Sequence, residues 1–183
     1  MAKEKSRKKK NKKGIIAVVS LIAVLAIAGL IWAWIALTPG YIFISDTVTN
    51  YFKAVSNEDR TLYKNTCYTG KWKDNYSNGG TDIDTALDEA FALQSGATYS
   101  NVKLVSEETL DDEFADKMED SLKNHYGIDV SISKIESVSF TVDVDFEGVT
   151  ESSGTITRYC YKSGFKWFFL SDPTVQVDLG IEG

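Results

Sequence analysis

Histidine is almost absent from this sequence. His125 is the only one among 183 residues, which excludes a metal site built from several histidines and an ordinary Ser-His-Asp arrangement. It falls at the end of a predicted helix, where a histidine is typically a capping or surface residue. We therefore expect no metal ligand and no catalytic base at this position.

Cysteine is also scarce, with Cys67 and Cys160 as the only pair. Their separation rules out a CxxC redox or metal motif. A disulfide between them would close a loop of about 94 residues and constrain the unfolded chain by about 4–5 kcal/mol. The alternative is two buried thiols that behave as small hydrophobic residues. The sequence leaves both possibilities open.

No other pattern indicates catalysis, a metal or a cofactor. An acidic cluster lacks the EF-hand spacing with its central glycine, and it is better explained as the negatively charged first turn of a helix (Asp111, Asp112, Glu113 and Asp116). Asp143 and Asp145 share one face of a predicted strand, and we expect them to be solvated. We predict no catalytic, metal-binding or cofactor-binding residue.

The sequence does contain one long apolar run. Residues 14–37 include no charged residue, and 13 of these 24 residues are Leu, Ile or Val. A helix of this length measures about 36 Å, which is enough to cross a hydrocarbon core of roughly 30 Å. The run is too long for a signal peptide, and no cysteine follows it for acylation. We predict an uncleaved transmembrane helix, with Trp32, Trp34 and Tyr41 at the membrane interface.

Charge is distributed very unevenly around this run. Residues 1–13 hold eight Lys or Arg and a single Glu, whereas the residues after 37 hold 12 Lys or Arg and 25 Asp or Glu, a net charge of −13. The positive-inside rule predicts a cytoplasmic basic tail that also attracts anionic lipid, and an acidic domain outside the membrane. Such a domain is not expected to bind nucleic acid.

Helical periodicity dominates the first part of this outer domain. The spacing of apolar residues predicts helices over 46–56, 58–67, 83–95 and 110–125, with Gly127 as the C-cap of the last. Ser45 and Thr81 are expected to cap the first and third. Residues 68–80 have the composition of a loop. A short strand is predicted over 101–106.

From Ile128 the apolar residues alternate with a period of two, which indicates strands. We predict strand structure from 128, a bend near 134–137, a long strand over 138–146, a turn over 148–154 and a closing hairpin over 155–170. The predicted organisation is a basic tail (1–13), a transmembrane helix (14–37), a linker (38–44), an α+β domain (45–172) and a weakly ordered acidic tail (173–183).

Two passages resemble the nuclear transport factor 2-like, or cystatin-like, α+β cone. TVTNYFKAVSNEDRTLYKNTCY (47–68) is similar to its opening helices, and YKSGFKWFFLSDP (161–173) to its final hairpin. The region 110–146 also resembles uncharacterised membrane-anchored proteins of Gram-positive bacteria. The resemblance implies helices followed by a curved antiparallel sheet. It also raises an enzymatic alternative, since some members of that superfamily move protons inside the cone.

These observations favour a non-catalytic interaction or scaffold module at the outer face of a cell membrane, with a protein or cell-envelope partner. A candidate contact surface is the aromatic set Tyr159, Tyr161, Trp167 and Phe169, which would otherwise fill a core. One alternative is a small-molecule-binding or lyase/isomerase-type domain that uses the cone cavity. A second is a scaffold subunit of a type IV secretion or conjugation system. The oligomeric state is not encoded in any pattern we recognise.

Overall fold

The computed structural model describes residues 24–33, 37–77 and 79–181. The chain divides into two compact units, residues 1–38 and residues 39–183, and each is described by itself. The predicted basic tail lies outside the described residues, as do 14–23 and 34–36 of the predicted transmembrane helix, including Trp34. Residues 24–33 are helical. Among the described residues, no helix has both the length and the apolar character needed to cross a membrane.

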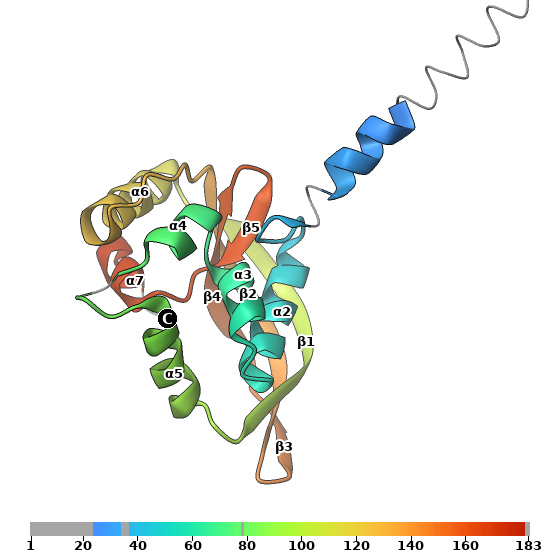
Figure 1. Cartoon of the computed structure of the whole chain (residues 1–183). Coiled ribbons are helices and arrows are strands. Elements are labelled where there is room, and N and C mark those ends of the chain that lie inside the picture. Colours follow the sequence, from blue (N-terminus) through green and yellow to red (C-terminus); the bar gives the residue numbers. More distant parts are fainter. Residues whose placement is uncertain (1–23, 34–36, 78, 182–183) are drawn as a thin grey trace, which may run out of the picture. The chain divides into compact units, whose positions relative to one another are not determined.

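The second unit is an α+β domain whose elements alternate little between helix and strand (Figure 1). Four helices come first, one helix interrupts the strands, and one follows them. In order they are α2 (Ile44–Ser56), α3 (Arg60–Cys67), α4 (Gly70–Asn75), α5 (Ile83–Leu93), β1 (Ala97–Thr109), α6 (Asp112–Tyr126), β2 (Lys134–Phe146), β3 (Val149–Ser152), β4 (Ile156–Ser163), β5 (Lys166–Phe169) and α7 (Pro173–Leu179).

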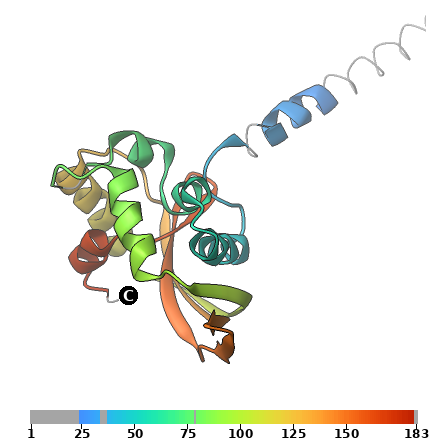
Figure 2. The same ribbon diagram turned by 60° about the horizontal axis from the view of Figure 1, so that its bottom comes forward.

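The sheet is antiparallel, with the order β1-β2-β4-β5, and β2 is its central strand. The first part of β2 pairs with β4, its last four residues pair with β3, and β1 lies along its other side. Two register shifts in β1 curl the sheet (Figure 2). At the first, Asn101 takes a φ of 51°, a left-handed conformation that asparagine tolerates better than most residues.

The helices form where the sequence supplies both an apolar face and a cap. The side chain of Asp59 accepts a hydrogen bond from the amide of Leu62 at the start of α3, and Asp172 does the same for Val175 at the start of α7. Gly127 ends α6 in the left-handed conformation at φ 66°, as predicted.

Aromatic rings fill the space between helices and sheet. Phe52 of α2 meets Phe140 of β2 edge-on with 5.3 Å between ring centroids, and the neighbouring Tyr51 stacks on Phe169 of β5 at 3.8 Å. Helices α2 and α3 form one group over β1 and β5, and α6 and α7 form another that contacts β2. Burial of these large apolar surfaces is the main source of stability.

Several predicted elements are corrected. Residues 70–75 form α4 where a loop was predicted, and residues 149–152 form β3 within a predicted turn. Ile128 and Ile132 are buried but belong to no strand, since the amide of Ile132 donates to the side chain of Glu119 on α6. The bend predicted at 134–137 is absent because β2 and β4 pair without a shift there.

The ends of the domain also differ from the prediction. The predicted linker 38–44 contains residues already paired with β5, and α2 begins at Ile44 after Phe43 rather than after Ser45. At the other end, residues 173–179 form α7, with Val175 and Leu179 in the core, where a weakly ordered tail was expected. Residues 182–183 lie outside the described part of the chain.

Candidate functional site

Three of the four residues of the candidate aromatic contact surface lie in the core, which was the alternative. Tyr161, Trp167 and Phe169 are buried, and only Tyr159 is half-exposed. The register pairs Cys160 with Phe169 and Tyr161 with Phe168, so the four residues do not share one face. A two-residue turn places odd-numbered residues of one strand opposite even-numbered residues of the next, which the parity argument overlooked.

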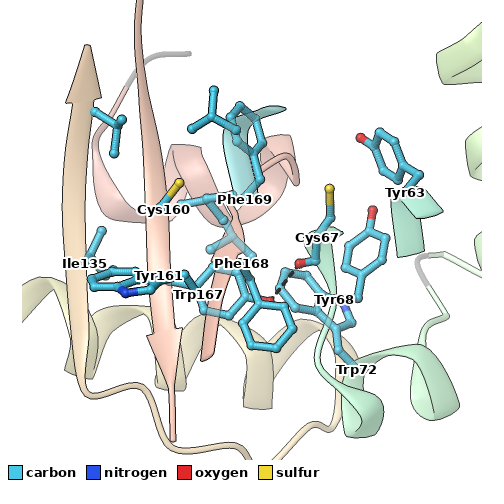
Figure 3. Close-up of a cluster of buried hydrophobic side chains, with 14 of the residues drawn as sticks. Tyr63, Cys67, Tyr68, Trp72, Ile135, Cys160, Tyr161, Trp167, Phe168 and Phe169 are labelled. Carbon is cyan, nitrogen blue, oxygen red and sulfur yellow. Dashed lines mark hydrogen bonds between the residues drawn. The ribbon is translucent and has the colours of Figure 1, made fainter. Parts of the chain in front are cut away.

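Tyr161 is a core residue with a satisfied hydroxyl. Its hydroxyl group donates to the carbonyl of Cys67 at 2.7 Å (Figure 3). Its ring stacks on Phe168 with 5.2 Å between ring centroids, and the ring centroid of Trp72 lies 6.1 Å from its own. This bond links the sheet to the end of α3. Because a buried hydroxyl without a partner is costly, the bond also fixes where α3 ends relative to β4.

Both cysteines are free thiols, and both are buried (Figure 3). Burial raises the pKa of Cys67 to about 12, and it raises that of Cys160 well above its usual value. A thiolate is the nucleophilic form of cysteine. In this fold, therefore, neither side chain is placed for covalent chemistry.

The remaining polar residues of the sequence analysis have structural partners. His125 and Ser121 both contact the same oxygen of Asp178, at 2.9 and 2.6 Å, which joins α6 to α7. In a catalytic triad the histidine lies between the serine and the acid, whereas here Ser121 and His125 each contact the acid, so the three residues do not form that arrangement. Asp143 and Asp145 accept bonds from Asn101 and Thr150 on neighbouring strands.

The acidic cluster behaves as the start of a helix. Asp112 and Glu113 lie in the first turn of α6, and Glu113 pairs with Lys117 at 2.7 Å. Among the described residues, no group of three or more acidic, histidine or cysteine side chains is placed to hold a metal ion.

A charged cluster that sequence reasoning missed lies across β1, β2 and β4. Lys134 contacts Glu136 at 2.5 Å, and the register brings Lys162 directly opposite Lys134. The other oxygen of Glu136 is buried and receives no hydrogen bond from the described residues. Burial, and next the nearby Glu136, raise the pKa of Glu107. The carboxyl group of Glu107, an exposed residue, thus lies close to that of the buried Glu136.

Trp167 connects this cluster to the start of the domain. The ammonium groups of Lys162 and Lys134 lie 5.4 and 6.0 Å from its ring centroid, within the range of cation–π attraction. Its backbone forms two hydrogen bonds with Tyr41, of 3.0 and 2.7 Å. Lys134 and Glu136 lie two residues apart on one strand, but only the register of the strands brings Glu107, Lys162 and Trp167 to them, so the sequence does not reveal the whole cluster.

No protein-family model matches the chain, and no curated protein or solved structure is found to be similar to it. The fold class is therefore known from the structure alone. It is an α+β domain with a curled antiparallel half-barrel sheet.

Two exposed regions remain as candidate contact surfaces. The first, which we call the β1 edge, is the open side of β1 with the exposed side chains of Leu104 and Val105. Phe146 and Val149 at the β2–β3 turn are also exposed, but Phe146 pairs with Ala97 at the start of β1 and Val149 lies on β3, so they are not part of this edge. Strand β1 ends the sheet, and in the described part of the chain it pairs only with β2. The second surrounds the turn between β4 and β5.

A hollow of about 270 Å³ lies between the start of α3 and α5. Its lining includes Glu58, Arg60 and Asp88, of which the last two form an ion pair. It contains neither a tyrosine nor a tryptophan. It therefore lacks the carboxylate beside an aromatic donor that the proton-transfer alternative requires.

Proposed function

We propose that this chain is a single-pass, membrane-anchored, extracytoplasmic module that binds a protein or cell-envelope partner and has no catalytic role. The observation that carries the proposal is the β1 edge, an open strand with exposed apolar side chains. An unpaired edge strand that also exposes adjacent apolar side chains is typical of a place where another molecule binds. The aromatic filling between α2 and the sheet adds support, because it occupies the space that a cone-cavity enzyme would use.

The two bulges determine how a partner would use this edge. The first sets Asn101 and Val102 against a single residue of β2, and the second leaves Val105 without an opposite residue. A continuous strand cannot pair along an edge that is interrupted twice. We therefore expect the partner to contact side chains around Val105 rather than extend the sheet.

Site-specific photocrosslinking of the full chain in its native membrane tests this function. A photoreactive residue at Val105, which is 58% exposed, should give one discrete crosslinked species that mass spectrometry can identify. A photoreactive residue at Val149, which is 60% exposed on β3, is a first control. Val177 is the matched control, since it is 77% exposed on α7, outside the β1 edge. Leu104→Lys should abolish the product at Val105. Equal labelling at all three positions would count against the proposal.

Cysteine accessibility tests the proposed topology. The native thiols are buried, so Ser152→Cys and Lys5→Cys can be probed against a low background. In intact cells a membrane-impermeant maleimide should label position 152, which is exposed, and not position 5. The reverse pattern would invert the topology, and turnover of any substrate by the purified chain would contradict a non-catalytic role. Conjugation genes beside the coding sequence would favour the type IV secretion version.

A further inference from the structure

The first residues of the domain form three hydrogen bonds with β5 and one with α3. The Gly40 amide donates to the carbonyl of Asn65 at 2.8 Å, and Tyr41 exchanges two bonds with Trp167. The buried ammonium of Lys166 donates to the Gly40 carbonyl at 3.0 Å. The position at which the chain enters the domain is thus fixed beside the β4–β5 turn.

Large apolar side chains are exposed on both segments that meet at this point. Ile42 and Phe43 follow Tyr41 and are 46% and 64% exposed, and Phe165 in the β4–β5 turn is 43% exposed. The Tyr41–Trp167 bridge is antiparallel, so it brings these two segments to one edge of the domain. Phe43 is the N-cap residue of α2 and its side chain forms no capping hydrogen bond, so helix capping does not explain why a phenylalanine stands at this position.

Positive charge accompanies this apolar edge. Lys134 and Lys162 are directly opposite each other in the β2–β4 register, an arrangement that costs stability in a sheet. Glu136 pairs with Lys134, whereas Lys162 has no acidic group within 4 Å among the described residues. Two lysines over one tryptophan are unusual in a domain that otherwise carries a large excess of acidic residues.

We propose that this surface, which we call the hairpin face (Ile42, Phe43, Lys134, Lys162 and Phe165), rests in the headgroup region of an anionic lipid bilayer. The inference rests on the proposed membrane anchor. Only three residues lead from Leu37 to Gly40, and at about 3.5 Å per residue they reach roughly 10 Å. The hairpin face is therefore the part of the domain that chain length keeps nearest to the bilayer.

The chemistry of the face suits this occupant. Aromatic and aliphatic groups enter the interfacial layer, and lysine side chains are attracted by anionic headgroups while their stems cover apolar surface. The acidic remainder of the domain is repelled by the same headgroups. Attraction at one face and repulsion elsewhere would hold the domain in one orientation, with the β1 edge available to a partner.

Fluorescence quenching in vesicles tests the inference with the full chain. An environment-sensitive fluorophore is attached to Phe43→Cys, Phe165→Cys, Val177→Cys or Trp32→Cys in separate preparations, and the unsubstituted chain gives the background from the buried native thiols. The chains are reconstituted into phosphatidylcholine vesicles with or without phosphatidylglycerol, and quenching by spin-labelled lipids is measured. We expect several-fold stronger quenching at positions 43 and 165 than at 177.

Charge is tested with a matched pair of substitutions. Lys162→Gln should reduce the extra quenching that phosphatidylglycerol causes at position 165, whereas Lys103→Gln on β1 should leave it unchanged. The Trp32 label reports on the anchor itself. No quenching there would overturn the anchor and this inference with it. Quenching at 32 without quenching at 43 and 165, or equal quenching at 177, would overturn the hairpin face alone.

Discussion

Gly40 is the residue whose replacement should most clearly expose how the domain begins. Its φ is +82°, and a Cβ atom added there would lie 2.6 Å from Cζ of Phe168 and 3.0 Å from Cβ of Lys166. The left-handed conformation costs an L residue about 1–2 kcal/mol. Forcing a methyl group into packed surroundings costs about 1–3 kcal/mol more. Gly40→Ala should therefore destabilise the domain by about 2–5 kcal/mol.

Gly154→Ala separates the two contributions. Gly154 has a φ of +70°, but an added Cβ would meet nothing within 4 Å, so only the backbone cost of about 1–2 kcal/mol applies. Gly40→Ala should therefore be less stable than Gly154→Ala by about 2 kcal/mol, which corresponds to a melting temperature roughly 4–8 °C lower for a domain of this size. Thermal unfolding of the full chain in mild detergent, followed by near-ultraviolet circular dichroism, measures it.

A double-mutant cycle then identifies the clash. Phe168→Leu removes the ring edge that the new methyl group would meet, so in that background Gly40→Ala should cost little more than Gly154→Ala. If the two glycine variants melt together in the wild-type background, or if Phe168→Leu leaves the cost unchanged, the argument from close packing is refuted.

Three further predictions concern titratable groups. Burial raises the pKa of Cys67 to about 12 and that of Cys160 well above its usual value, so neither thiol should react with maleimide at neutral pH until denaturant is added. The unfolded, non-reduced chain should then carry two labels. An unfolded chain without labels would indicate a disulfide and would contradict the structure. A hydrogen bond from Ser121, and next one from His125, lowers the pKa of Asp178, so its stabilisation is present above the unfolded-state pKa and lost as pH falls through the folded-state value. Asp178→Asn should thus lower the free energy of unfolding at pH 7 by about 0.5–1 kcal/mol, after allowance for solvent screening, and the difference should fade below about pH 4. Burial, and next the nearby Glu136, raise the pKa of Glu107, so its effect on stability has the opposite sign: the stabilisation is present at low pH and is lost as pH rises through the folded-state pKa. Glu107→Gln should therefore stabilise the domain by a few tenths of a kcal/mol at pH 7 and not at about pH 4. Equal effects at both pH values would argue against an interaction between the two carboxyl groups.

The sequence predicts well those elements that carry their own periodicity and caps. Met118 and Leu122 are spaced four residues apart, both are buried, and α6 lies within two residues of its predicted bounds. The long strand β2 is likewise indicated by its alternation. Helix α4 has only six residues and one buried residue, Trp72, so there is no period to detect. Helix α7 lies where a weakly ordered tail was predicted, although Asp172-Pro173, an N-cap aspartate before a first-turn proline, is a helix-start signal.

The candidate surfaces were harder to predict because they depend on register. A bulge shifts every later residue relative to its neighbour across the sheet, and the residue pattern of β1 does not show where its two bulges fall. The apolar side chains of Leu104 and Val105 therefore read as ordinary strand residues. Phe165 lies more than a hundred positions after Ile42 and Phe43, and only the Tyr41–Trp167 bridge brings the two segments to one edge.

The same bridge affects the order in which the domain can fold. The contact between Gly40 and Lys166 spans 126 positions, and Tyr51 stacks on Phe169, which is synthesised after Lys166. Contacts of such long range form slowly, and here α2 and α3 can pack on each other and on β1 but lack their contacts with β5 until β5 has been synthesised. A chain that crosses a membrane during synthesis must remain unfolded until it has passed through. Under the proposed topology, the late synthesis of β5 would help to provide that delay.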